Sequence, residues 1–170
     1  MSWTDTEADG LVNIQRVLAH RPGVIPAARA LSAFGEHALG WMGLAAVGAA
    51  ADRARRGQWV RLGAAAFVSH AASVVIKRIV RRPRPHDERI AIGVGTPSKL
   101  SFPSSHATST AAAMVALSRI LGSPAPLAVV PVMMASRMVL GVHYPTDVAS
   151  GALLGAATAE AMRRMERASE

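Results

Sequence analysis

Two histidines lie among small and cationic residues in the second half of the chain. His106 follows two serines in the stretch FPSSHATSTAAAM, and His143 lies in the stretch SRMVLGVHYPTD. An imidazole can attack phosphorus, or it can protonate a departing oxygen. A single histidine would more often have a structural role, so the interpretation depends on which other side chains reach the same place.

Three cations are candidates for an oxyanion-binding site, namely Lys77, Arg84 and Arg137. A guanidinium group is planar, stays charged and binds phosphate oxygens in pairs. A helix that begins at Ser104 would add free N–H groups and the positive end of its dipole. The hydroxyl groups of Ser104 and Ser105 could also donate hydrogen bonds. These residue types predict a site for a phosphate-like anion.

Asp147 follows His143 by four residues, across the turn HYPTD. It could accept the Nδ1 proton of His143 and leave Nε2 free to attack, as the acid does in a Ser-His-Asp triad. The fixed cations could stabilise charge that a metal ion often stabilises. Because no carboxylate cluster suited to Mg²⁺ or Zn²⁺ is evident and the chain has no cysteine, we expect no metal and no other cofactor.

Apolar segments must position these residues. The chain has 170 residues, enough for one domain, and 51% of them are hydrophobic. Five segments have about the length that crosses a hydrocarbon core of about 30 Å, near 31–51, 58–80, 104–121, 124–141 and 146–162. Their many small residues suit close helix packing in a bilayer. We expect an all-α integral membrane bundle of five to six helices, a single domain over residues 1–170, with a soluble bundle as the alternative.

The site should lie at one membrane face. If successive helices alternate in direction, the ends that carry the candidate residues all meet at the same face. Residues 4–20 read as an amphipathic helix, with Leu11, Ile14, Val17 and Leu18 on its apolar side. Such a helix could lie in the membrane interface.

The net charge of +8 could indicate nucleic-acid binding. Arginines, however, cluster at the ends of the apolar segments, where they meet lipid headgroups, and Arg81 and Arg82 read as interface anchors of this kind. We therefore expect a bilayer and an anionic lipid as partners, and no nucleic acid; the oligomeric state is not predicted. The end opposite the site carries Arg53, Arg55, Arg56, Arg61, Arg163, Arg164 and Arg167. The positive-inside rule then predicts a multi-pass protein of the plasma (inner) membrane with its site outside the cytoplasm.

Three elements, in this order, resemble the signatures of the type 2 phosphatidic acid phosphatase superfamily. KRIVRRPRP fits K-x6-R-P, PSSH fits P-S-G-H, and SRMVLGVHYPTD fits S-R-x5-H-x3-D; together they span residues 77–147. The same signatures occur in vanadium haloperoxidases. One residue departs from the pattern, since Ser105 stands where glycine is commonest.

The resemblance implies a role for each matching residue. His143 would be the nucleophile that forms a phosphohistidine, His106 the general acid and Asp147 the group that orients His143. The phosphate would be held by Lys77, Arg84, Arg137, Ser104 and the amide of Ser105. Three further ionisable residues near the same face, Glu36, His37 and His70, are candidates for headgroup contacts.

The implied activity is hydrolysis of a lipid phosphate, without a metal ion. The small size and the segment LSAFGEHALGWMGLAAVGA resemble members that act on the polyprenyl substrate decaprenylphosphoryl-5-phosphoribose. Undecaprenyl diphosphate and phosphatidylglycerophosphate are alternative substrates within the superfamily. A haloperoxidase and a non-enzymatic lipid-binding membrane protein are alternatives of other classes.

Overall fold

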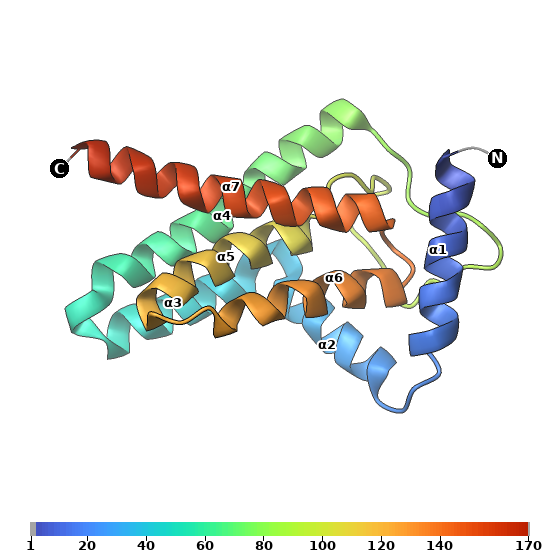
Figure 1. Cartoon of the computed structure of the whole chain (residues 1–170), viewed down its shortest axis with the longest axis horizontal. Coiled ribbons are helices and arrows are strands. Elements are labelled where there is room, and N and C mark those ends of the chain that lie inside the picture. The colour runs from blue at the N-terminus through green and yellow to red at the C-terminus, as the bar shows by residue number, and fades with distance from the viewer. Residues whose placement is uncertain (1–2, 170) are drawn as a thin grey trace.

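The computed structural model describes residues 3–169, and these residues form helices joined by loops (Figure 1). The α-helices are α1 (Trp3–Leu18), α2 (Val24–Gly35), α3 (Leu39–Ala51), α4 (Arg56–Val80), α5 (Ser105–Leu121), α6 (Val129–Val139) and α7 (Pro145–Ser169). Short 3-10 helices cover Glu36–Ala38, Arg53–Arg55 and Ala125–Ala128. With α2 and α3 counted as one interrupted element, the described bundle has six, so the all-helical prediction is confirmed.

Helix α5 forms the centre of the bundle and packs against α4, α6 and α7 (Figure 1). Every residue from 106 to 114 is buried, and most are alanine, serine or threonine. Glycines on α7 bring the two backbones together: a Cβ atom at Gly155 would lie 2.0 Å from the Thr108 carbonyl oxygen. Small residues thus permit the close helix contact that the composition predicts.

The first expected span, near 31–51, is not a continuous helix. It breaks at Glu36–Ala38, where His37 and Ala38 have φ values of 50° and 61°. The break leads directly into Gly40, where a Cβ atom would lie 2.4 Å from the Phe34 carbonyl oxygen. The chain bends sharply at this point, and the bend turns the polar pair Glu36 and His37 towards the end of the bundle that carries His106.

Two other helices also differ from the expected spans. Helix α6 has 11 residues and rises about 16 Å, whereas residues 124–141 were expected to form one crossing. Helix α7 runs beyond 162 to Ser169. Among the described residues, one helical segment, Arg53–Val80, is long and apolar enough to cross a membrane by itself. A crossing by the other helices depends on how they pack together.

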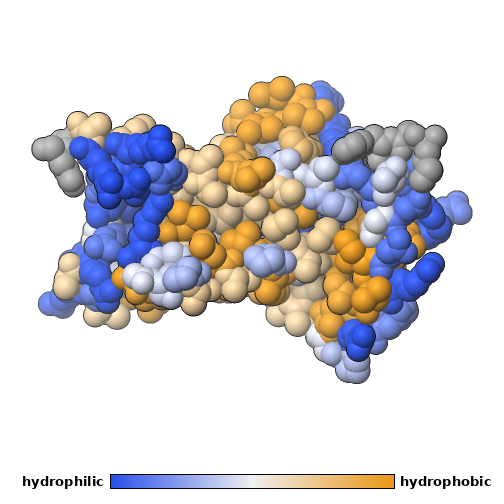
Figure 2. Space-filling model, in the orientation of Figure 1, coloured by the Kyte–Doolittle hydropathy of each residue, from blue (hydrophilic) through white to orange (hydrophobic). Residues whose placement is uncertain are grey.

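Apolar residues cover the middle of the visible surface, and hydrophilic residues cover its two ends (Figure 2). Several large apolar side chains are more than half exposed, including Val47, Phe67, Val75, Ile79 and Leu153. An extended apolar surface of this kind is unfavourable in water. The distribution favours a lipid environment around the middle of the bundle.

Helix α1 crosses the end of the bundle and contacts α6 and α7 (Figure 1). Leu11 is fully buried against this end, as the amphipathic pattern predicts, whereas Val17 on the same expected face is exposed. The Gln15 side chain donates to the carbonyl oxygens of Ala91 and Val139 at 2.7 and 2.9 Å. Helix α1 is therefore fixed to the loop after α4 and to the end of α6.

We predict opposite effects for the same glycine-to-alanine change at two helical positions. Gly155→Ala should lower stability by about 1–3 kcal/mol, because its methyl group would overlap the backbone of α5. Gly43→Ala, where no atom lies within 4 Å, should raise stability slightly through its helix propensity. Thermal unfolding in detergent measures both. Equal melting temperatures for the two variants would contradict the close α5–α7 packing.

Candidate active site

A cavity of about 310 Å³ opens at the end of the bundle where α4 ends and α5 begins. It is bordered by the α2–α3 break, the loop after α4, and the end of α6. The predicted site residues that line it are Glu36, His37, His70, Lys77, Arg84, Ser105, His106, Arg137 and His143. Ser104 and Asp147, the other two predicted residues, are buried outside this lining. Helices distant in sequence thus bring the predicted set to one place.

His143 is almost completely buried, and its Nε2 atom lies 3.2 Å from Nη1 of Arg84. Because a guanidinium group can only donate, Nε2 accepts and the ring proton is on Nδ1. Burial, followed by the charge of Arg84, lowers the pKa of His143 well below its usual value. The imidazole is therefore neutral at physiological pH, and its unprotonated nitrogen is Nε2, which accepts from Arg84 at the wall of the cavity.

Asp147 lies next to His143 but does not form the hydrogen bond expected from the sequence. Its Oδ2 atom is 3.7 Å from Nδ1 of His143, and Nδ1 has no hydrogen-bond partner. The carboxylate instead accepts from the Tyr144 amide at 2.8 Å and from Arg82 Nη1 at 2.9 Å. A shift of roughly 0.5 Å would bring Nδ1 and the carboxylate within hydrogen-bond range.

Arg82 and Glu7 are neighbours of the site that the sequence did not reveal. Arg82 was expected to be an interface anchor, but it donates to Asp147 and to Glu7, and it lies over the Tyr144 ring at 4.2 Å from the centroid. Glu7 also accepts from the Thr146 hydroxyl at 2.6 Å. This network links α1 to the turn that carries His143. Arg81, the adjacent residue, is exposed and fits the anchor interpretation.

Among the described residues, the three predicted cations donate only to neutral groups, namely carbonyl and hydroxyl oxygens and, for Arg84, Nε2 of His143. Lys77 donates to the carbonyls of Leu100 and Ser101, and Arg84 to the carbonyls of Ser98 and Val142. Burial lowers the pKa of Arg84 to about 10, so this guanidinium remains charged at neutral pH.

Arg137 is the most deeply buried of these cations. It is 2% exposed, its Nη1 donates to the Ser32 hydroxyl at 2.5 Å, and its Nε has no partner. None of Lys77, Arg84 and Arg137 forms an ion pair with a described carboxylate. Buried charge without a counter-ion is unfavourable, so the cavity is suited to an anion that pairs with all three.

His106 stands on the opposite wall, in the first turn of α5. Its Nε2 atom is 2.9 Å from the Ser32 carbonyl oxygen, which can only accept, so Nε2 carries a proton. Glu36 lies 3.8 Å from the same nitrogen. The ring packs against Gly35, where a Cβ atom would be 2.7 Å from His106 Cδ2. A glycine at the α2–α3 break is therefore needed for His106 to occupy this position.

The beginning of α5 adds backbone donors to the site. Ser104 caps the helix by accepting from the Ala107 amide, and its own amide donates to the Asp147 carbonyl at 2.9 Å. The first amide groups of a helix have no intrahelical acceptor and attract anions. Ser105, which replaces the usual glycine, has its hydroxyl oxygen 2.8 Å from that of Ser73. The substitution therefore keeps the cavity open and adds a polar group to its wall.

Comparison with known proteins places these features among lipid phosphatases. Residues 58–169 match the PAP2 superfamily. Decaprenylphosphoryl-5-phosphoribose phosphatase of Mycolicibacterium smegmatis is 62% identical over 141 residues, which are 83% of this chain and 78% of that protein. The protein of the same name from Mycobacterium tuberculosis H37Rv is 55% identical over 146 residues, or 86% of this chain and 82% of the relative.

Two solved structures share the fold. The transmembrane PAP2 type phosphatidylglycerolphosphate phosphatase of Bacillus subtilis has a TM-score of 0.72 and 18% identity, covering 95% of this chain and 87% of that one. Aquifex aeolicus LpxE has a TM-score of 0.73 and 18% identity, covering 89% of this chain and 92% of that one. At this identity the similarity establishes the arrangement of helices alone.

The charge of the cavity predicts tight binding of a tetrahedral oxyanion. Orthovanadate should raise the melting temperature of the purified protein, and Arg84→Gln should weaken its binding on the order of 10- to 100-fold, because a charge-assisted contact is lost. Arg81→Gln removes the same charge from an exposed side chain that does not line the cavity, and it should bind vanadate as the wild type does. Unchanged affinity in Arg84→Gln would exclude this residue from the anion site.

Proposed function

The chain belongs to the PAP2 superfamily, and from this premise we propose that it is a phosphatase that hydrolyses a polyprenyl-linked phosphate, with decaprenylphosphoryl-5-phosphoribose as its preferred substrate. The observation that carries the proposal is the neutral His143, whose unprotonated Nε2 lies at a cavity with three cations that form no ion pair with a described carboxylate, two of them buried. The names of the curated relatives support the choice of substrate.

The reaction proceeds in two steps. Nε2 of His143 attacks phosphorus and forms an N–P bond, while the P–O bond to the lipid-linked sugar breaks. Before this step, Nε2 of His106 leaves the Ser32 carbonyl and forms a hydrogen bond with the substrate instead. The departing oxygen then takes the proton from this nitrogen. Water then attacks the phosphohistidine, His106 accepts its proton, and inorganic phosphate leaves as the N–P bond breaks.

The cations stabilise the charge that develops on the transferred group. Lys77, Arg84 and Arg137 contact its non-bridging oxygens from three elements, in a site shielded from bulk water. The amides at the start of α5, beside Ser104 and Ser105, add neutral donors. Since positive charge is already fixed around the phosphate, the reaction needs no metal ion, and activity should persist in the presence of a chelator.

Three ionisable residues at the cavity, Glu36, His37 and His70, are suited to bind the headgroup of the substrate. The rings of His37 and His70 meet edge to face, with centroids 5.8 Å apart. Ribose hydroxyl groups can donate to the Glu36 carboxylate and exchange hydrogen bonds with the imidazoles. This wall would therefore favour a sugar phosphate over a simple phosphatidate.

The protein would be a multi-pass component of the plasma membrane, with its active site at the outer face. The apolar surface between two hydrophilic ends supports a position across the bilayer (Figure 2). The excess of arginines at the end remote from the cavity supports the orientation. In this arrangement α1 lies in the interface beside the active site, and the polyprenyl chain remains in the lipid.

Phosphate release by purified protein in detergent tests the proposed function. The substrates are decaprenylphosphoryl-5-phosphoribose, undecaprenyl diphosphate, phosphatidylglycerophosphate and phosphatidic acid, each with and without EDTA. Release should be fastest with the first, and His143→Ala should reduce it on the order of 10³-fold or more.

His20→Ala provides the matched control, because His20 is exposed and lies outside the cavity. It should retain wild-type activity. Faster release from another lipid would assign a different substrate within the superfamily. No release from any of the four by folded protein would instead favour a non-enzymatic lipid-binding role.

Arg82→Gln tests whether the network around Asp147 positions His143. We expect kcat to fall about 10- to 100-fold with KM nearly unchanged, because His143 loses alignment while the phosphate contacts remain. Arg82→Lys should recover part of the loss, since an ammonium group can still reach one carboxylate, and Arg81→Gln should have no effect. If Arg82→Gln lost activity only because less of the protein was folded, the network would have a structural role and would not position His143.

A further inference from the structure

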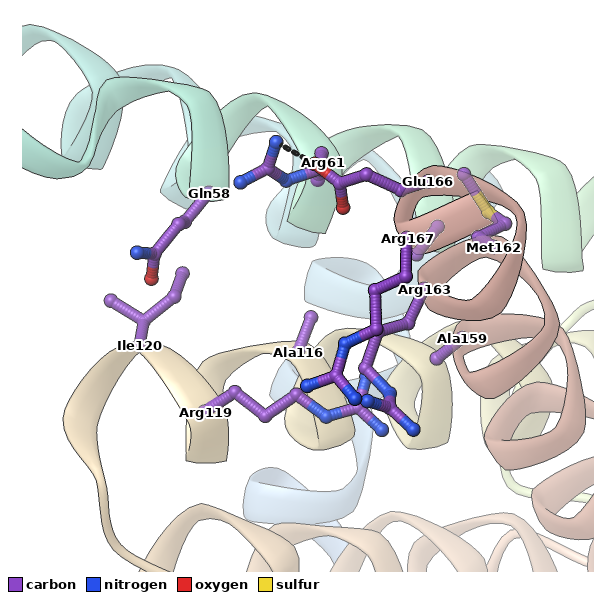
Figure 3. A pocket seen from close by; sticks show the side chains of 11 residues that line it. Gln58, Arg61, Ala116, Arg119, Ile120, Ala159, Met162, Arg163, Glu166 and Arg167 are labelled. Carbon is purple, nitrogen blue, oxygen red and sulfur yellow. Dashed lines mark hydrogen bonds and ion pairs between the residues drawn. The ribbon is translucent and has the colours of Figure 1, made fainter. Parts of the chain in front are cut away.

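A second cavity, of about 500 Å³, lies between α4, α5 and α7 (Figure 3). It is formed by the first half of α4 and the second halves of α5 and α7, whereas the active-site cavity lies where α4 ends and α5 begins. No residue borders both cavities. The larger cavity therefore needs an explanation of its own.

Arginines form its rim. Figure 3 shows the guanidinium groups of Arg119, Arg163 and Arg167 gathered on one side, with Arg61 paired to Glu166 on the other. Side chains of the same charge repel one another, so a group of this kind is stable only where negative charge lies close by.

The carboxylates of this region do not balance the arginines. Glu160 alone accepts from three guanidinium groups, those of Arg119, Arg163 and Arg164. Arg61 pairs with Glu166. Arg167 forms no such ion pair with a carboxylate of the described residues. Among the described residues, four arginines line the cavity and a fifth, Arg164, shares Glu160 with two of them, so the two carboxylates leave an excess of positive charge at the mouth of the cavity.

The floor of the cavity is apolar. Ala116, Ile120, Ala159 and Met162 line it beneath the arginines, and Figure 3 shows Ile120 and Met162 at its two ends. A soluble anion would make no use of this surface. A molecule with an anionic head and an apolar body would satisfy both the rim and the floor.

The position of this cavity along α4 corresponds to the headgroup layer on the side of the membrane opposite the active site. Gln58 borders this cavity and Lys77 borders the other, both on α4. Nineteen residues separate them, a rise of about 28 Å along a helix, close to the thickness of a hydrocarbon core. When the active site lies at one interface, as the membrane part of the proposed function requires, the arginine-rimmed cavity lies at the other.

We propose that this cavity binds an anionic phospholipid of the leaflet opposite the active site. The headgroup phosphate pairs with Arg119, Arg163 and Arg167, and the first part of the acyl chains lies on the apolar floor. Guanidinium groups suit this role because each can bind two phosphate oxygens. The lipid phosphate adds negative charge to that of Glu160 and Glu166, which alone do not balance the arginines. The lipid also contacts α4, α5 and α7 and helps to hold them together.

Binding to phosphatidylglycerol, measured by native mass spectrometry and by thermal stabilisation, tests the proposal. Saturating vanadate fills the active site, so lipid bound there does not contribute. Arg119→Gln/Arg167→Gln should weaken binding about tenfold or more. The matched control is Arg53→Gln/Arg56→Gln, which removes the same charge from the same end; its binding should stay within about twofold of the wild type, because neither residue lines the cavity or pairs with Glu160.

Two further ligands test whether the bound molecule needs both a net negative charge and acyl chains. Phosphatidylcholine and soluble glycerol phosphate should each bind at least tenfold more weakly than phosphatidylglycerol, because the first has no net negative charge and the second has no acyl chains. If the two double variants lost affinity for phosphatidylglycerol equally, the effect would come from general surface charge, and the proposed site would be wrong. Glycerol phosphate binding as tightly as the lipid would replace the lipid with a soluble anion. Neither result depends on phosphatase activity, which both double variants should retain.

Discussion

Unpaired positive charge buried around His143 is the constraint on which the rest of the structure depends. Lys77 and Arg137 are almost inaccessible, and none of the three cations of the site forms an ion pair with a described carboxylate. The helices and the loop after α4 hold these like-charged groups close together. Charge that is unfavourable when buried without a counter-ion becomes favourable when it pairs with a phosphate group, so binding and charge stabilisation have one origin.

The carboxylate nearest to His143 is kept away from those cations. Asp147 is bound by Arg82 and by the Tyr144 amide, and Arg82 is held in turn by Glu7 from α1. Lys77, Arg84 and Arg137 are therefore not neutralised by the carboxylate that lies next to His143. Helix α1 takes part in this separation of charge, because its Glu7 holds Arg82 against Asp147.

The sequence predicted an all-helical bundle and predicted which residues meet at one cavity, but it did not predict where each helix breaks and ends. Alternating helix directions and three short motifs predicted that Lys77, His106 and His143 lie close together, and all three border one cavity: Lys77 near the end of α4, His106 in the first turn of α5, and His143 in the turn before α7. The break at His37 escaped prediction, since a polar pair inside an apolar run gives no sign of a positive φ. The roles of Arg82 and Glu7 also escaped it, because their contact joins residues 75 positions apart. Such pairings arise from tertiary packing and leave no local pattern.

Transfer of phosphate to His143 is the central claim, and trapping the intermediate tests it most directly. Purified protein would be mixed with ³²P-labelled substrate, quenched in alkali within milliseconds and analysed by peptide mass spectrometry. The account predicts an acid-labile phosphate on Nε2 of His143, formed as fast as the lipid product is released and absent in His143→Ala. Turnover by the wild-type protein with label on another residue, or on none, would contradict it.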